Sequence, residues 1–269
     1  MKPLSELSLE TARAVRVVLT DIDDTLTTDG LLTGRAYAAL ERLHQAGFIV
    51  IPVTGRPAGW CDHIARMWPV DAVVGENGAF YFRYDRERKT MQQHFWASPE
   101  ERAQNRSRLA AIESEVLATV PGCALASDQP YRLADLAIDF CEDVPALAET
   151  EVDRIVSIFE RAGAQAKVSS IHVNGWFGDY DKLTMARTLL ADGFNMNWDE
   201  ARQSVIYAGD SPNDEPMFAA FPLSVGVANI QAFAHRLKHK PAYMTQGHSG
   251  DGFAELADLL LRTRSREII

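Results

Sequence analysis

The feature that most constrains the fold is an alternation of short β-branched, apolar segments with segments of helical period. Residues 15–20 have the pattern of a buried strand, residues 33–46 that of a helix ending before Gly47, and residues 48–53 that of a second strand. A helix to about residue 68 and a strand at residues 71–74 follow. Such alternation is typical of a parallel sheet, whose right-handed crossovers bring the carboxyl ends of its strands to one edge. We expect any ligand to bind along that edge.

The pattern changes near Arg83. The charged residues 83–89 predict a hairpin tip or a crossing segment. After them we expect strands at residues 91–96, 131–140 and 166–173 and helices at residues 99–120 and 145–162. This order indicates a separate α+β unit inserted into the α/β chain.

The strand–helix alternation resumes after residue 181. We expect helices at residues 182–191, 216–220, 230–237 and 252–262, and strands at residues 204–208, 223–227 and 242–244. The predicted fold class is therefore α/β: a Rossmann-like core of parallel strands with an inserted α+β cap. We place the core domain at residues 1–82 and 181–269 and the cap domain at residues 83–180.

Composition excludes some classes of function. The 269 residues include 27 Lys and Arg but 37 Asp and Glu, a net charge of −10, so we expect no nucleic-acid partner and no anionic membrane partner. We find neither a signal-peptide pattern at the N-terminus nor an apolar run near the roughly 18 residues of a membrane span. The three scattered cysteines fit neither a disulfide framework nor a zinc site. We expect a soluble cytoplasmic protein, a monomer or a homodimer.

An acidic cluster directly follows the first strand, where Asp21, Asp23 and Asp24 lie within four residues. Two unit charges about 4 Å apart interact by about 4 kcal/mol at an effective dielectric constant of 20, so such a cluster favours a bound cation. Mg²⁺, which prefers oxygen ligands, is the natural candidate. The alternative is a solvated acidic turn that caps the next segment.

Three further segments carry chemistry. Asp210 follows the strand at residues 204–208, and on a strand adjacent to that of Asp21 the two carboxylates would converge on one cation. Thr54, Gly55 and Arg56 precede a helix with Pro57 at its start, which favours anion binding, although an ordinary strand–helix turn has the same pattern. Lys182 begins the helix that leads back into the core, and it gains weight only from these companions.

These segments, in this order, resemble the motifs of the haloacid dehalogenase-like phosphohydrolase superfamily. The four motifs correspond to Asp21-Ile22-Asp23-Asp24-Thr25, to Thr54, to Lys182 and to Gly209-Asp210-Ser211-Pro212-Asn213-Asp214. The insertion between the second and third motifs, and the phrase Gly75-Glu76-Asn77-Gly78-Ala79, are similar to the type-II, IIB-capped subgroup. That subgroup includes sugar-phosphate phosphatases, among them sucrose-phosphatase and mannosyl-3-phosphoglycerate phosphatase, and the phosphomannomutases.

The resemblance implies a Mg²⁺-dependent phosphomonoester hydrolase that acts through an aspartyl-phosphate on a small phosphorylated substrate, which we expect to be a sugar phosphate. Asp21 would be the nucleophile and Asp23 the general acid and base, while Thr54 and Lys182 would neutralise the phosphoryl oxygens. The expected metal ligands are Asp21, Asp23 through its backbone carbonyl, Asp210 and Asp214, although Asn213 and Asp214 would alternatively hold the metal's water molecules or orient Lys182. The expected substrate contacts are Thr54, Gly55, Arg56, Asn77, Asn174, Lys182 and Asn213.

Two other functions use a similar set of residues. A phosphomutase uses the same pair of aspartates and returns the phosphoryl group to a second hydroxyl. A phosphoacceptor signalling module also gathers acidic residues, a threonine and a lysine around Mg²⁺, but it lacks the second aspartate and the inserted cap. In the cap, Trp176 stacks on a sugar ring in one interpretation and packs the seam between cap and core in the other.

Overall fold

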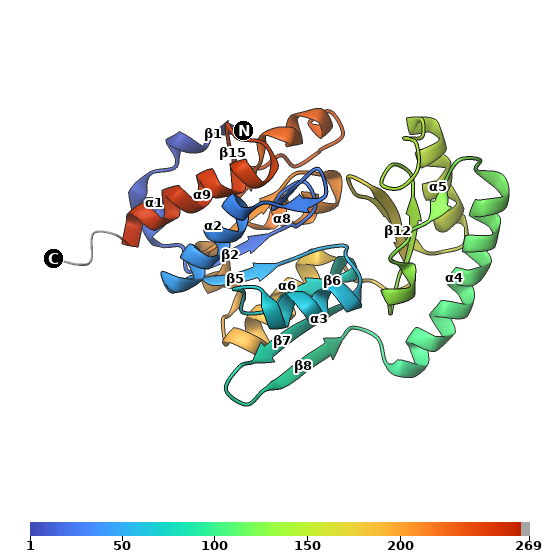
Figure 1. Cartoon of the computed structure of the whole chain (residues 1–269), viewed down its shortest axis with the longest axis horizontal. Coiled ribbons are helices and arrows are strands. Elements are labelled where there is room, and N and C mark those ends of the chain that lie inside the picture. The colour runs from blue at the N-terminus through green and yellow to red at the C-terminus, as the bar shows by residue number, and fades with distance from the viewer. Residues whose placement is uncertain (265–269) are drawn as a thin grey trace.

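The apolar segments at the two ends of the chain assemble into one parallel sheet. The structure is a computed structural model that describes residues 1–264. The strands of this six-stranded sheet are, in spatial order, β1 (Lys2–Pro3), β15 (Tyr243–Met244), β14 (Leu223–Gly226), β13 (Val205–Gly209), β2 (Val17–Thr20) and β5 (Ile49–Pro52) (Figure 1). The predicted α/β fold class with a parallel core sheet is confirmed.

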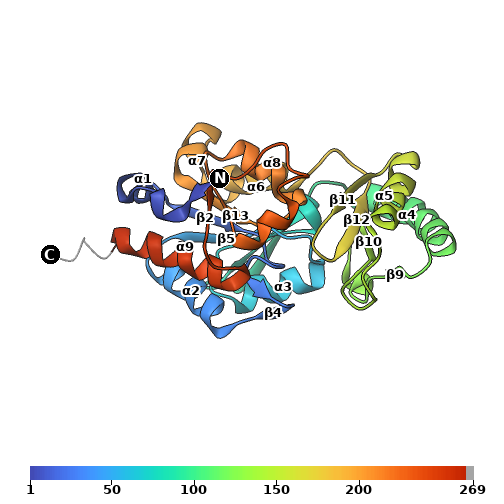
Figure 2. The same ribbon diagram turned by 90° about the horizontal axis from the view of Figure 1, so that it is seen from above.

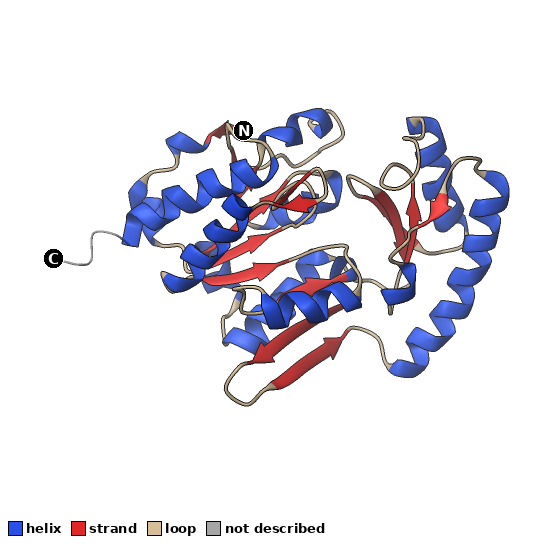
Figure 3. Cartoon of the chain, viewed as in Figure 1, coloured by secondary structure: helices blue, strands red, loops and turns tan. Residues whose placement is uncertain are grey.

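Helices cover both faces of this sheet, because the strands carry apolar side chains on both faces and each face must be buried. Val18 and Val50 pack into a cluster with α1 (Leu9–Arg13), α2 (Gly34–Gln45), α3 (Ala58–Met67) and α9 (Ser249–Arg264). Val17, Leu19 and Ile51 point the other way, toward α6 (Lys182–Phe194), α7 (Trp198–Ser204) and α8 (Glu215–Ala220). The helices and strands are distinguished by colour in Figure 3.

A hairpin extends the edge of the core. β6 (Val73–Gly75) joins β5 through a parallel bridge between Val53 and Val74, and it pairs antiparallel with β7 (Phe80–Asp85), which pairs with β8 (Thr90–Phe95). The charged segment at residues 86–89 is the tip of this hairpin, as one of the two interpretations predicted. The predicted first boundary of the cap, at residue 83, falls within β7; the division into domains stays a prediction.

A second unit, residues 99–176, is called the cap from here on. Its antiparallel sheet has the order β11 (Gln165–Val168), β12 (His172–Trp176), β10 (Leu136–Asp139) and β9 (Ala124–Leu125). The helices α4 (Pro99–Thr119) and α5 (Glu149–Arg161) pack against it around a separate apolar cluster. Figure 2 shows these helices on the outer side, so that the sheet lies between them and the core.

Some predicted elements differ from the structure. The strand predicted at residues 166–173 is two strands, β11 and β12, because Ser169 Oγ accepts the N–H groups of Ile171 and His172 and closes a turn. The strand predicted at residues 131–140 is reduced to β10, since the 3₁₀ turn η3 (Gln129–Tyr131) precedes it. The helix predicted at residues 230–237 is the 3₁₀ segment η5 (Ala228–Phe233).

The remaining short hairpin, β3 (Thr27–Thr28) with β4 (Leu31–Leu32), follows the segment of the acidic cluster. Its turn residues Asp29 and Gly30 both have positive φ, the geometry that suits a two-residue hairpin loop. Among residues 1–264, no helix has both the length and the apolar character needed to cross a membrane.

Candidate active site

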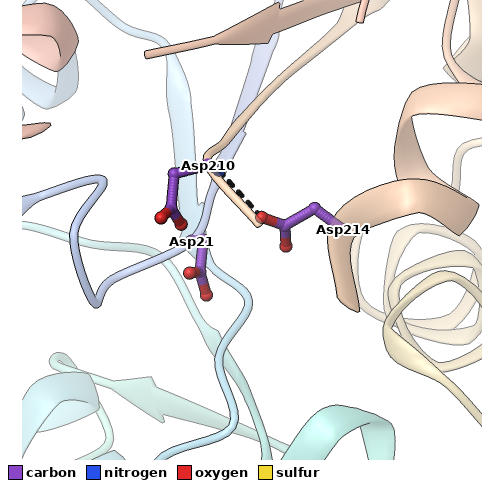
Figure 4. Close-up of side chains that lie close together, drawn as sticks. All are labelled: Asp21, Asp210 and Asp214. Atoms are coloured by element: carbon purple, nitrogen blue, oxygen red, sulfur yellow. Dashed lines mark hydrogen bonds between the residues drawn. The ribbon is translucent and has the colours of Figure 1, made fainter. Parts of the chain in front are cut away.

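The ends of two neighbouring strands bring three carboxylates together. Asp21 follows β2 and Asp210 follows β13, and these strands are hydrogen-bonded neighbours. Asp214 comes from the short 3₁₀ turn η4 (Pro212–Asp214) behind them. Oxygens of the three carboxylates lie within 4.8 Å of one another, and Figure 4 shows all three groups at the same edge of the sheet.

Burial makes this cluster electrostatically unfavourable without further positive charge. Burial raises the pKa of Asp21 to about 8, assisted by Asp214 and Asp23 and opposed by Lys182. Burial, with the neighbouring charges of Asp21, Asp214 and Asp24, likewise raises the pKa of Asp210 well above its ordinary value. The single positive charge of Lys182 cannot balance three buried carboxylates, whereas Lys182 together with one divalent cation would make the site nearly neutral. A donor set made of carboxylate oxygens fits Mg²⁺.

Lys182 is the cation that the chain itself provides. It is the first residue of α6, whose N-cap Asp181 accepts the backbone N–H of Thr184. Its Nζ lies 2.8 Å from Asp21 Oδ1 and 2.7 Å from Asp214 Oδ1, with only 1% of the residue exposed. Although burial opposes the charge, Asp21 and Asp214 raise the pKa of Lys182, so the ammonium stays protonated.

The hydrogen bonds of Asp214 differ from those of the other two aspartates. Its Oδ1 accepts from Lys182 Nζ and the Tyr207 hydroxyl, and its Oδ2 accepts from the backbone N–H groups of Asp210 and Ser211. A carboxylate has about four acceptor positions, so those of Asp214 are all used within the protein. The arrangement therefore suits Asp214 to holding Lys182, and its predicted role as a metal ligand stays a prediction.

Asp210 and Asp21 retain free acceptor positions. Asp210 Oδ1 accepts from Thr25 Oγ1 at 3.2 Å, and its Oδ2 accepts from Asn229 Nδ2 at 3.2 Å. Asp21 Oδ1 accepts from Lys182, and no hydrogen bond from residues 1–264 reaches its Oδ2. These two carboxylates are therefore the side chains best placed to hold a cation. Sequence patterns did not point to Asn229 or Tyr207, because each contributes through a contact with one of the aspartates.

The side chain of Asp23 points to a different partner, Arg56. The guanidinium Nε lies 3.0 and 3.1 Å from the two oxygens of Asp23, and one terminal nitrogen lies 2.8 Å from Oδ1. The same guanidinium pairs with Glu142 of the cap at 2.7 Å and with Asp128 at 3.4 Å, and it lies over the ring of Trp60. A role for Asp23 as metal ligand stays a prediction that concerns only its backbone carbonyl.

Glu142 was not expected from the sequence. Burial alone would raise its pKa, but the contact with His172 and the hydrogen bond and charge of Arg56 outweigh burial and lower the pKa to about 2. The His172 Nε2 atom lies 2.8 Å from Glu142 Oε2. The cap therefore places a carboxylate that remains ionised beside the arginine that follows Thr54 and Gly55.

The expected phosphate-binding segment has the predicted neighbours. Thr54 Oγ1 accepts the backbone N–H of Arg56 at 3.0 Å. Asn77 lies against Gly55, where an added Cβ would be 3.1 Å from Asn77 Nδ2, and its Oδ1 accepts from Asn213 Nδ2 at 3.4 Å. The buried Asn77 Nδ2 has no hydrogen-bond partner within residues 1–264, so this amide donor is available to a ligand.

Cap residues complete the enclosure. Asn174 lies on β12, where its Nδ2 donates to Asp135 Oδ2 at 3.1 Å. A cavity of about 10 Å³ remains between cap and core, which is roughly the space of one water molecule. Its walls include the predicted residues Asp21, Asp23, Gly55, Arg56, Asn174 and Asn213. Trp176 is only 1% exposed and stacks on Tyr180, which fits the packing interpretation and not the sugar platform.

Comparison with known proteins agrees with these observations. A family model described as haloacid dehalogenase-like hydrolase matches residues 18–102. The C-terminal domain of trehalose-6-phosphate phosphatase from C. albicans is 14% identical, with 97% of this chain and 98% of that domain covered and a TM-score of 0.72. A search of curated protein sequences found no significant match.

Two further solved structures share the fold. The sucrose-phosphatase from Synechocystis sp. is 16% identical, with 91% of this chain and 97% of that chain covered and a TM-score of 0.61. A sugar phosphatase of subclass IIB is 15% identical, with 91% and 98% covered and a TM-score of 0.61. The predicted resemblance to the haloacid dehalogenase-like superfamily is confirmed by the family model over residues 18–102, and the solved structures share the fold over nearly the whole chain.

Proposed function

We propose that the chain is a Mg²⁺-dependent phosphatase acting through an aspartyl-phosphate, because a family model described as haloacid dehalogenase-like hydrolase matches residues 18–102. The observation that carries this proposal is the buried group of Asp21, Asp210 and Lys182 at the carboxyl edge of the sheet. This group places a carboxylate with an unoccupied oxygen beside a fixed ammonium. We further propose a cytoplasmic protein, a monomer or a homodimer.

In the first half of the reaction, an Asp21 oxygen forms a bond to phosphorus while the bond from phosphorus to the ester oxygen breaks. Asp23 gives its proton to the departing oxygen. Lys182 and the hydroxyl of Thr54 stabilise the negative charge on the phosphoryl oxygens. Asp21 and Asp210 would hold Mg²⁺, which would further neutralise the charge on the phosphoryl oxygens.

In the second half, water attacks the phosphorus of the aspartyl-phosphate, and Asp23 accepts a proton from that water. The bond between phosphorus and the Asp21 oxygen breaks, which releases inorganic phosphate and restores both carboxyl groups. Asp214 holds Lys182 in place through the whole cycle, since its four acceptor positions are occupied by the protein.

The ion pair between Asp23 and Arg56 has a consequence for the mechanism. Both oxygens of Asp23 accept hydrogen bonds from the Arg56 guanidinium. When Asp23 is protonated, one of these oxygens becomes a donor and can no longer keep its contact with the guanidinium. Arg56 must therefore release Asp23 before proton donation, and the substrate's phosphate offers it another anionic partner. This exchange would couple substrate binding to the readiness of the acid.

We propose a sugar phosphate as substrate. The cavity of about 10 Å³ beside Asp21 is too small for a sugar phosphate, but a pocket of about 240 Å³ lies next to it, lined by Asp23, Arg56 and Glu142. We propose that the substrate enters through this pocket and that cap and core move apart to let its phosphate reach Asp21. The asparagines Asn77, Asn174 and Asn213 would contact the bound molecule, Asn174 from the cap and the others from the core. Polar amides with fixed orientation are suited to hydroxyl groups and phosphate oxygens.

The test is release of inorganic phosphate from sugar phosphates, nucleotides and phosphoglycerates, with and without Mg²⁺. We expect Mg²⁺-dependent hydrolysis of sugar phosphates, and loss of turnover in Asp21→Asn with an unchanged circular dichroism spectrum. Hydrolysis at the wild-type rate by Asp21→Asn would contradict the mechanism. Conversion of a sugar phosphate into its positional isomer, without release of phosphate, would instead indicate the phosphomutase.

A further inference from the structure

One buried carboxylate outside the reacting group joins the core to the cap. Glu76 follows β6 in the core and is fully buried. Its Oε2 accepts the backbone N–H groups of Leu133, Ala134 and Asp135 at 3.1, 2.6 and 3.1 Å, all from the cap. Its Oε1 accepts the N–H of Leu133 at 2.9 Å and that of Ala58, in the first turn of α3, at 3.0 Å.

The segment held by Glu76 is the one that carries the cap's polar side chains toward the site. Arg132, directly before it, donates to the carbonyl of Gly55 at 2.8 Å and pairs with Asp128 and Asp135. Asp135, its last residue, accepts from Asn174. Fixing the three amides therefore fixes Arg132 over the loop of Gly55 and Asn174 at the cavity wall.

The backbone around Glu76 is adapted to this contact. Glu76 and Asn77 both have positive φ, 43° and 53°, a conformation that is unfavourable for residues with these side chains. Gly78, with a φ of 108°, has no room for a Cβ, which would lie 2.1 Å from the carbonyl oxygen of Asp181 beside Lys182. Three consecutive residues thus contact the cap, the loop of Gly55 and the start of α6.

We propose that Glu76 is a positioning residue: its carboxylate docks residues 133–135 of the cap on the core and thereby sets Arg132 and Asn174 for substrate. The docking itself follows from the contacts, while its effect on substrate rests on the proposed phosphatase function. Glu76 touches neither the substrate nor the reacting atoms, so it acts on binding more than on the chemical step. Burial, with the charge of Asp135, raises the pKa of the Glu76 carboxyl to about 7, so keeping this carboxylate ionised at the contact costs folding free energy.

The experiment compares Glu76→Gln with the exposed control Glu87→Gln by amide hydrogen exchange and by kinetics on the best sugar phosphate. In Glu76→Gln we expect exchange in residues 133–135 about tenfold faster and KM about tenfold higher, with kcat changed by less than about threefold. Glu87→Gln should match the wild type. Wild-type exchange and wild-type KM in Glu76→Gln would overturn the proposal.

A second variant separates docking from charge alone and guards against misfolding. Glu76→Asp keeps the charge but shortens the side chain, so docking predicts faster exchange at residues 133–135 here too. Wild-type exchange in a folded Glu76→Asp would overturn the docking. If the wild-type protein hydrolyses no phosphate ester, the phosphatase proposal fails, and the exchange result still decides whether Glu76 docks the cap.

Discussion

The ammonium of Lys182 lies 2.8 Å from Asp21 Oδ1, and both side chains are almost completely enclosed by protein. The same ammonium contacts Asp214, so one buried cation lies between two buried carboxyl groups. Charges removed from water in this way gain little net stability from each other, but removal of one partner leaves the others uncompensated. The pair is therefore explained better by chemistry at Asp21 than by stability.

Replacement of the lysine should show this cost. We expect Lys182→Met to lower the free energy of unfolding by about 3–5 kcal/mol in metal-free buffer, because Asp21 and Asp214 lose their counter-charge. Chemical denaturation measures the change. Lys167→Met, on the exposed side of β11, is the control and should shift stability by less than about 0.5 kcal/mol. Equal effects of the two substitutions on the free energy of unfolding would contradict the role of Lys182 as the counter-charge of Asp21 and Asp214.

Stability should also depend on pH in a defined direction. Burial raises the pKa of Asp21 from 3.8 to about 8 and, with Asp135, that of Glu76 from 4.5 to about 7. Each group contributes its full stability below its unfolded pKa, near pH 4, and loses it as the pH rises through 7 to 8. The metal-free protein should therefore melt at a lower temperature at pH 8 than at pH 5.

Two controls accompany this pH series. The lowered pKa of Glu142, about 2, affects stability only as the pH falls below about 4.5, outside this window. Asp21→Asn should weaken the decline between pH 5 and 8, and saturating Mg²⁺ should flatten it. A melting temperature that rises steadily from pH 5 to 8 in metal-free buffer would show that the buried carboxyls are not destabilised as described.

Arg56 should be sensitive to a substitution that keeps its charge. Lysine cannot contact both oxygens of Asp23 and also reach Glu142, because its single ammonium lacks the planar fork of guanidinium. We expect Arg56→Lys to lower kcat/KM for a sugar phosphate by about tenfold or more. Arg66→Lys, in an exposed ion pair with Asp62 on α3, should leave kcat/KM unchanged. Steady-state kinetics on both variants measure kcat/KM. Full activity in Arg56→Lys would contradict the need for a guanidinium at position 56.

Asn229 should affect metal binding without touching the metal. Its Nδ2 holds Asp210 Oδ2 at 3.2 Å and the backbone carbonyl of Asp24 at 2.9 Å. Loss of such a supporting hydrogen bond weakens metal affinity by about 10–100-fold. Isothermal titration of Asn229→Ala with Mg²⁺ measures this, with Asn105→Ala on α4 of the cap as the control. If Asn229→Ala bound Mg²⁺ with wild-type affinity, Asn229 would have no supporting role in metal binding.

Residues close in sequence account for the features that could be predicted. The alternation of strands and helices is a local pattern, and the carboxyl ends of parallel strands meet at one edge whatever the loops do. The proximity of Asp21 and Asp210 therefore follows from the strand pattern and the position of each aspartate after its strand. Lys182 was weak evidence alone, but its place at the start of α6 agrees with the predicted helix.

Long-range contacts account for the features that could not be predicted. Glu142 reaches Arg56 because Asp139 accepts the backbone N–H groups of residues 141–143 and folds that loop toward the core. Glu76 acquires its role only from the position of residues 133–135, which are distant in sequence. The turn at Ser169 divided a predicted strand into β11 and β12, since its hydroxyl replaces ladder hydrogen bonds there.

The most direct test is chemical trapping of the intermediate. The protein is quenched in acid during turnover of its best sugar phosphate, the acyl phosphate is reduced with borohydride, and the peptides are analysed by mass spectrometry. The account predicts homoserine in place of aspartate at position 21, and none in Asp21→Asn. Reduction at another carboxyl group, or steady turnover with no reduced residue at position 21, would contradict it.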